Sequence, residues 1–126
     1  MAQIEPVAWF RNAHPEQGSL RVQVSAARGI FPVPGASVEV YRDFGALRET
    51  FYTGVTDDSG IAGRILLPAL PVSLGLSADT AGISGTAYQV AVRHPDYRET
   101  EHQQVLIFPR IESVLAVTLP PRQEEG

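Results

Sequence analysis

The sequence contains no cysteine and no lysine, and each absence excludes a kind of chemistry. Without cysteine the chain has no disulfide framework and no thiolate metal site, so its stability has to come from packing, and its redox compartment stays undetermined. Without lysine it has no side-chain amine for a Schiff base, for a phosphate-binding loop or for an isopeptide crosslink.

Positive charge and long apolar runs are also scarce. The formal net charge is -4 and the acidic residues are scattered, so we expect no nucleic-acid partner. The longest apolar stretch, residues 65–71, is too short to span a bilayer, and residues 1–10 lack the basic and apolar pattern of a secretory signal peptide. We therefore expect no membrane span, and these features assign no compartment.

A chain of 126 residues fits one domain with one ordinary core. Within it, short stretches alternate between apolar and polar residues, turn signals separate them, and none keeps a sustained helical period. These features predict an all-β fold with little helix, a seven-stranded antiparallel β-sandwich. The predicted strands are residues 19–26, 36–41, 49–56, 61–67, 87–94, 99–108 and 111–119.

We place the sandwich domain at residues 18–119, after an irregular N-terminal lead-in at residues 1–17 and before a polar tail at residues 120–126. Trp9 and Phe10 in the lead-in are expected to dock on the domain; the alternative is that they stay exposed as an interaction patch. Residues 69–86 are rich in small residues without a strong pattern, and a segment of this length is functional, mobile or an added edge strand.

A hairpin turn is predicted at residues 56–60, Thr-Asp-Asp-Ser-Gly, so the strands at residues 49–56 and 61–67 are expected to pair with each other. An Asp-Ser-Gly cluster supplies a side-chain acceptor and a residue that is free to adopt positive φ. Asp57 and Asp58 also suggest calcium, but the further oxygen ligands of a calcium loop are missing from the sequence. The turn is therefore the favoured interpretation.

The three histidines, His14, His94 and His102, are the first candidates for acid–base or metal chemistry. None of them has the short spacing from another that favours metal binding on one element, and each lies beside turn residues, so surface or capping roles are favoured. Ser59 and Ser84 lie near glycines but outside a G-x-S-x-G pattern. We expect a non-enzymatic protein without a metal or cofactor.

Several stretches together resemble the transthyretin-like, or carboxypeptidase regulatory-like, sandwich domains, close to the Cna protein B-type repeats. The resemblance covers roughly residues 18–119 and implies a fold more specifically than an activity. The stretches that carry it are residues 18–24, Gly-Ser-Leu-Arg-Val-Gln-Val; 34–40, Pro-Gly-Ala-Ser-Val-Glu-Val; 56–60; Leu67-Pro68; 88–92, Tyr-Gln-Val-Ala-Val; and 94–97, His-Pro-Asp-Tyr.

The chemistry known in these families is not carried over to this chain. Cna B-type domains form an internal isopeptide from a first-strand lysine, and the first strand here offers Arg21 instead. The hydroxyisourate hydrolase branch ends in Tyr-Arg-Gly-Ser, whereas residues 120–126 read Pro-Pro-Arg-Gln-Glu-Glu-Gly. The Pro-Gly loop, the 56–60 turn and residues 105–114 also look like small envelope-associated proteins of spore-forming Firmicutes.

The expected function is that of a non-catalytic interaction or scaffolding module, at a bacterial cell envelope or spore or within a larger assembly. Its partner would be another protein, or a second copy of the chain, bound through a sheet edge. A carbohydrate-binding accessory domain is the alternative, with a glycan stacked on exposed tyrosines, and a hydroxyisourate-hydrolase-like enzyme is less favoured. The candidate interaction surface consists of Phe31, Val33, Tyr41, Phe44, Tyr52, Leu74 and Leu76.

Overall fold

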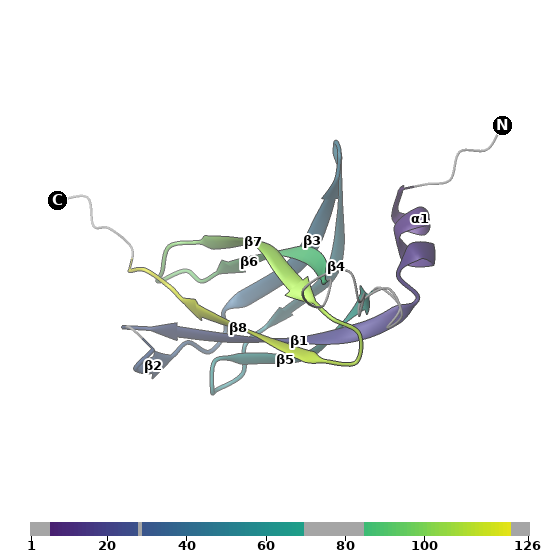
Figure 1. Ribbon diagram of the computed structural model, residues 1–126. Helices are drawn as coiled ribbons and strands as arrows, with labels where there is room; N and C mark the ends of the chain where they lie inside the picture. Colours follow the sequence, from purple (N-terminus) through teal and green to yellow (C-terminus); the bar gives the residue numbers. More distant parts are fainter. Residues whose placement is uncertain (1–5, 28, 70–84, 122–126) are drawn as a thin grey trace.

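The computed structural model describes residues 6–27, 29–69 and 85–121 of the chain, which form two packed β-sheets and one short helix (Figure 1). No helix among these residues is long and apolar enough to cross a membrane. In chain order the elements are α1 (Pro6–Ala13), β1 (Glu16–Ala26), β2 (Phe31–Pro32), β3 (Ser37–Phe44), β4 (Leu47–Val55), β5 (Ile61–Ala69), β6 (Thr86–Arg93), β7 (Thr100–Ile107) and β8 (Glu112–Thr118).

Each layer of the sandwich is one sheet. Sheet A has β1 at its centre, with β5 and the short β2 along one side of β1 and β8 along the other. Sheet B has the order β4-β3-β6-β7. The predicted all-β sandwich is confirmed, with two differences: β2 raises the number of strands to eight, and β1 pairs with β8 in parallel rather than antiparallel.

Strand β1 shows how the alternating pattern produces the core. Leu20, Val22 and Val24 point between the sheets and are at most 2% exposed, while Arg21 and Gln23 lie on the outer face. Burial of each such apolar side chain stabilises the fold by about 2 kcal/mol. The equivalent inward positions of the other long strands complete one continuous core, which includes Val38, Val40, Ile65, Leu67, Tyr88, Val90, Val92, Ile107 and Val117.

The N-terminal segment, predicted to be irregular, contains helix α1. The helix is only two turns long, so its apolar pattern is too brief to be read from the sequence, and Phe10 attaches it to the core. Phe10 is 1% exposed, stacks on His14 with ring centroids 4.0 Å apart and meets Phe51 edge to face. Trp9 is 60% exposed. The prediction that both aromatic residues dock is therefore right for Phe10 and wrong for Trp9.

The predicted turn at residues 56–60 is confirmed, but the expected hairpin is wrong: β4 pairs with β3 in sheet B and β5 pairs with β1 in sheet A, so the turn joins the two sheets. Asp57 Oδ1 accepts hydrogen bonds from the backbone N–H groups of Ser59 and Ile61, at 2.9 and 3.0 Å. Gly60 has φ 76°, and a Cβ there would collide with the carbonyl oxygen of Val24. Asp57 therefore acts as the acceptor of a turn, as expected.

Candidate functional site

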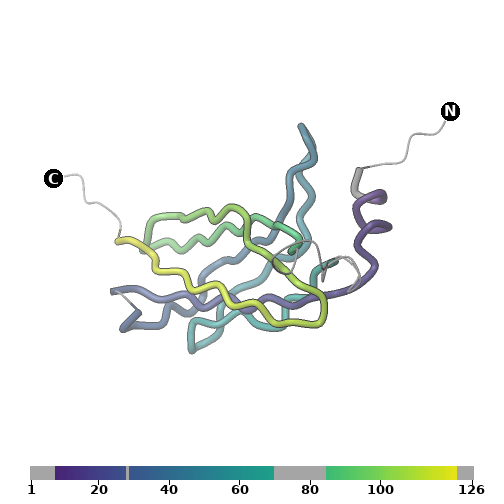
Figure 2. Tube along the Cα trace, in the orientation of Figure 1, coloured from purple at the N-terminus to yellow at the C-terminus, as the bar shows by residue number. Residues whose placement is uncertain are grey.

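Strands β7 and β8 are the edge strands of the two sheets along one side of the sandwich, called the open side below (Figure 1). Sheet B has four long strands, whereas sheet A has three long strands and the two-residue β2. Because β2 lies on the β5 side of β1, sheet A ends at β8 next to the edge strand of sheet B. Figure 2 shows β8 running along this side toward the end of the molecule opposite α1.

The backbone of β8 is regular, and half of its polar groups face away from β1. Ile111 accepts a hydrogen bond from Ser19 N at 3.1 Å, and Leu119 N donates to Ser25 O at 2.8 Å. Because successive residues of a strand direct their N–H and C=O groups to opposite sides, the even-numbered residues 112–118 direct theirs to the open side. No strand of the described residues pairs with that side of β8.

A groove of about 550 Å³ lies between β7 and β8. Val105 and Leu115 line it and are only partly buried, although both pack against the core. Leu106 and Val114, also in its lining, are 45% and 56% exposed. One hydrogen bond crosses the groove, from Ser113 Oγ to the carbonyl oxygen of Leu106 at 3.0 Å. An extended segment laid against β8 would cover these apolar side chains.

The two edges differ in how well they would receive such a segment. Strand β7 has an irregular register opposite Tyr88 and Val90, and Gln104 in that stretch has φ 57°. A bulge of this kind disrupts the hydrogen-bond ladder and protects an edge from further pairing. Strand β8 keeps an uninterrupted register from Glu112 to Thr118. The regular backbone of β8 is therefore the better template.

His102 is the titratable inward-facing residue of the groove. It lies opposite Val90 on β7, and its Nε2 is 3.1 Å from Thr100 Oγ1. Burial lowers its pKa below the ordinary value for histidine. The neutral imidazole is thus the form that fits this partly apolar surface.

The structure brings few residues of the candidate interaction surface together. Phe31 is 61% exposed on β2, as expected, but Val33 is buried, which corrects its assignment. Val33 is buried because its carbonyl oxygen accepts a 2.6 Å hydrogen bond from Thr56 Oγ1, which holds the loop against the core. Leu74 and Leu76 lie outside the described residues.

Tyr41 is also buried, so its selection as an exposed tyrosine was wrong. The alternation after the inward-facing Val40 places Tyr41 on the outer face of sheet B, where Arg48 lies over its ring at 3.9 Å. Its hydroxyl donates to Glu101 at 2.8 Å. Phe44 and Tyr52 are half-buried and pack against the core, so the predicted sugar-stacking platform of Tyr41, Phe44 and Tyr52 is not formed.

The three histidines lie in separate parts of the chain, His14 after α1, His94 after β6 and His102 on β7, and each interacts with residues close to it in the chain. His14 Nδ1 is 2.7 Å from the carbonyl oxygen of Phe10, and burial is the main cause that lowers its pKa. His94 Nδ1 accepts a hydrogen bond from Asp96 N at 3.1 Å. Within the described residues no group of histidine and acidic side chains is arranged to hold a metal ion.

The sequence interpretation missed the groove residues Val105, Leu106, Val114 and Leu115. One feature of the sequence could have indicated them: Val114 is an apolar residue at an outward position of the predicted strand 111–119. The pattern alone could not identify a site, because the groove depends on which strands end up as neighbours.

The fold defines the chain as a transthyretin-like β-sandwich. It is similar to the 5-hydroxyisourate hydrolase of Klebsiella pneumoniae, with a TM-score of 0.52 and 15% identity over 84% of this chain and 92% of that one. It is also similar to the catechol 1,2-dioxygenase of Pseudomonas arvilla C-1, with a TM-score of 0.55 and 14% identity.

A third similar structure is GBS52, the minor pilin of Streptococcus agalactiae, with a TM-score of 0.52 and 14% identity over 88% of this chain. The chain spans 54% of the dioxygenase and 47% of the pilin. No protein-family model and no curated protein sequence matches the chain. Identities this low establish a shared fold and leave activity undefined.

Proposed function

We propose that this protein is a non-catalytic interaction module that binds an extended segment of another protein along β8. The observation that carries the proposal is the regular, unpaired side of β8 beside the partly exposed apolar side chains of the groove. Backbone hydrogen bonds to residues 112–118 would provide affinity, and the groove would select apolar side chains at alternate positions of the added strand.

A protein partner suits the groove better than a charged ligand does. Its lining is mostly uncharged, with the carboxylate of Glu101 at one end, and its apolar members gain from being covered. Self-association through the same edge is the second form of this proposal, because β8 carries only one charged residue, Glu112, at one end. Two antiparallel copies of β8 centred on Leu115 would place Glu112 opposite Thr118, so like charges would not meet.

The cell envelope or the extracellular space is the proposed location. The likeness to a pilin supports this assignment at the level of the fold. The absence of enzyme activity is likewise part of the proposal. It is supported by the polar contacts that His14, His94 and His102 make with groups only two to four residues away in the chain.

A proline scan of the free edges tests the proposal. Ala116→Pro removes an N–H group that faces the open side, so the β1–β8 ladder and the fold should persist while strand addition is blocked. Thr53→Pro is the matched control: Thr56 N bonds to Ala36 O, so the alternation directs the N–H of Thr53 to the free edge of β4. Circular dichroism establishes that both variants are folded.

The readout is differential capture from the native host, quantified by mass spectrometry, together with light scattering for self-association. We expect a specific captured protein, or a dimer, that is lost on Ala116→Pro and kept on Thr53→Pro. Hydrogen exchange should then show slower exchange of the Val114 and Ala116 amides in the complex. Identical capture and an identical oligomeric state for the wild type and Ala116→Pro would overturn the proposal.

A further inference from the structure

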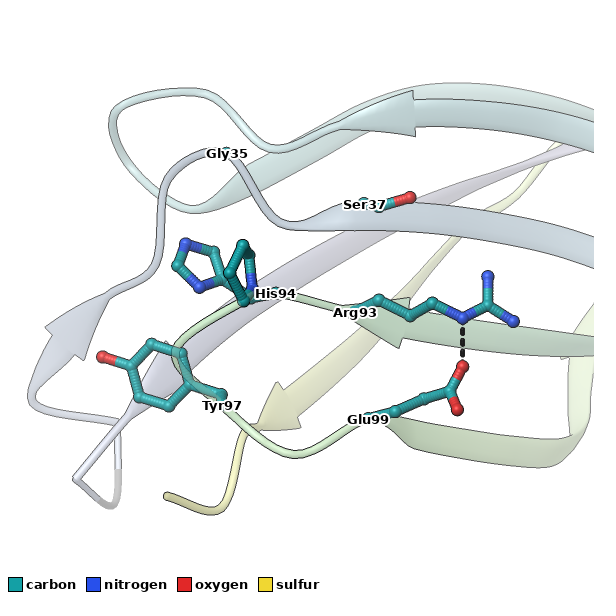
Figure 3. Close-up of a pocket in the computed structure, with 7 residues that line it drawn as sticks. Gly35, Ser37, Arg93, His94, Tyr97 and Glu99 are labelled. Carbon is teal, nitrogen blue, oxygen red and sulfur yellow. Dashed lines mark hydrogen bonds and ion pairs between the residues drawn. The ribbon is translucent and has the colours of Figure 1, made fainter. Parts of the chain in front are cut away.

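We propose that a second site, a pocket at the end of sheet B, binds a neutral sugar. The pocket has a volume of about 450 Å³ and is formed where β3 begins, where β6 ends and where the chain turns toward β7 (Figure 3). Its lining residues are Gly35, Ser37, Arg93, His94, Pro95, Tyr97 and Glu99. This volume lies within the range of about 300–1,000 Å³ that is typical of small-molecule sites.

Aromatic rings and hydrogen-bonding groups occupy separate parts of the pocket. His94 and Tyr97 lie together with ring centroids 5.3 Å apart, and the paired side chains of Arg93 and Glu99 lie beyond them (Figure 3). The hydroxyl of Ser37 lies on the opposite side, on β3. A sugar has the same two features, since the C–H groups of its ring face pack on aromatic rings while its hydroxyls donate and accept hydrogen bonds.

The Arg93–Glu99 pair suits adjacent hydroxyl groups. The guanidinium donates and the carboxylate accepts, so one hydroxyl of a sugar can accept from Arg93 while its neighbour donates to Glu99. Their side chains are 48% and 49% exposed, which leaves both groups accessible to a ligand. A second carboxylate, that of Glu39, lies 3.4 Å from Arg93 Nη1.

The charges favour a neutral ligand over an anionic one. Glu39 and Glu99 together outweigh the single positive charge of Arg93, so a carboxylate or phosphate would meet net negative charge. His94 adds a donor: its Nδ1 accepts from Asp96 N, which leaves Nε2 to donate to a ligand. A purely apolar ligand would remove water from these polar groups without replacing its hydrogen bonds, at a cost in affinity.

This site does not depend on the proposed edge interaction, because none of its lining residues belongs to the β7–β8 groove. It also differs from the predicted platform of Tyr41, Phe44 and Tyr52, of which Tyr41 is buried and the other two are half-buried against the core.

Saturation-transfer NMR tests the inference with glucose, N-acetylglucosamine and their β-linked disaccharides, and with glucuronate as the anionic counterpart. We expect transfer to at least one neutral sugar and weaker transfer to glucuronate. Glu99→Gln should weaken binding about tenfold, because it removes a charged acceptor. Glu101→Gln, which alters a carboxylate outside the pocket on the adjacent strand, is the matched control and should bind as the wild type does.

Two further variants are measured in the same experiment, one outside the pocket and one inside it. Ala116→Pro should keep full sugar binding, so failure of the edge proposal and failure of the sugar proposal are distinguishable. Arg93→Met should weaken binding as Glu99→Gln does, with its fold checked by thermal melting. The inference is overturned by the absence of transfer to every neutral sugar, by preferred binding of glucuronate, or by binding that is insensitive to both Glu99→Gln and Arg93→Met.

Discussion

The outer faces of the two sheets differ in how their side chains are arranged. On sheet B the polar side chains bond to one another across the strands. Glu39 accepts from Thr50 Oγ1 at 2.7 Å and from Arg93 Nη1 at 3.4 Å, and Tyr41 donates to Glu101 at 2.8 Å. Further along the same face, Gln89 Nε2 donates to Gln103 and to Asp43.

Exposed apolar side chains occur on both sheets, Val55 on β4 being 65% exposed, but on sheet A no comparable network of side-chain hydrogen bonds surrounds them within the described residues. Leu66 on β5 and Val114 on β8 are 59% and 56% exposed, and Phe31 on β2 is 61% exposed. Between the two long strands lies Arg21 of β1, whose buried Nε has no hydrogen-bond partner. Covering exposed apolar groups lowers the free energy because it removes them from water. Pairing a buried donor with a new acceptor lowers it as well.

The difference indicates where each kind of partner can bind. A face whose polar groups already bond to one another offers little to a protein, except at its end, where Arg93 and Glu99 stay accessible. A sheet with exposed apolar side chains and a regular free edge gains more from an added strand. The two proposals therefore fall on different sheets, and they can be tested separately.

The largest expected change in stability comes from substituting Thr56, which lies where the chain passes from one sheet to the other rather than on an outer face. Thr56 is buried, donates from Oγ1 to Val33 O at 2.6 Å and accepts from Ala36 N at 2.9 Å. Thr56→Val leaves these backbone groups without partners and should lower the free energy of unfolding by about 2–4 kcal/mol. Urea denaturation measures this loss.

Thr53→Val is the matched control for that substitution. Thr53 is exposed on β4, so its change should stay within about 0.5 kcal/mol. Equal losses for the two variants would show that the Thr56 hydroxyl does not fix the crossing between the sheets.

The next effect concerns the outer face of sheet B. Tyr41→Phe removes the hydroxyl that donates to Glu101 while the ring stays in place under Arg48. We expect a loss of about 1 kcal/mol in the free energy of unfolding, the usual contribution of one hydrogen bond. Tyr52→Phe, a half-buried tyrosine outside this network, should change stability less in the same denaturation experiment. The opposite order would contradict the idea that the network stabilises sheet B.

A smaller effect depends on pH through the two partly buried histidines. Burial lowers the pKa values of His14 and His102, so the unfolded chain binds protons more readily than the folded protein. Stability should therefore be fully present above pH of about 6.5 and should fall as the pH drops from there toward the lowered folded-state values. Melting temperatures at intervals between about pH 7.5 and 5, above the range in which carboxylates titrate, measure this fall.

His102→Gln tests the origin of the pH effect. It should flatten the dependence, because the glutamine side chain does not titrate. His14→Gln, at the other histidine whose pKa burial lowers, should flatten the dependence as well. A slope that neither His102→Gln nor His14→Gln alters would place its cause elsewhere.

The strands and the turn could be predicted because their signals are local. Alternating residues such as Leu20, Val22 and Val24 define a half-buried strand, and the Asp57–Gly60 stretch defines its turn. The parallel pairing of β1 with β8 could not be predicted, because strand order depends on contacts between distant segments. Helix α1 was missed because its stability rests on one tertiary anchor, Phe10, rather than on its own pattern.

Side-chain exposure was predicted less well than strand position. Tyr41 occupies an outward position, yet Arg48 and Glu101 cover it, and such cover comes from neighbouring strands. The open side has the same origin, since Val114 becomes part of a groove only when β8 lies beside β7. The local pattern therefore gives the direction of a side chain, and the strand order determines what lies next to it.

The smallest expected change in stability comes from substitutions on the outer face of sheet A, and it tests directly whether the apolar side chains there are exposed in solution. Leu66→Ser and Val114→Ser replace side chains that are more than half exposed, so each should change the free energy of unfolding by about 0.5 kcal/mol or less. Fluorescence of a hydrophobic dye such as ANS should decrease in both variants, because the apolar surface shrinks. A loss above about 1 kcal/mol would mean that the side chain is covered in solution. Light scattering would then show whether a second copy of the chain provides that cover.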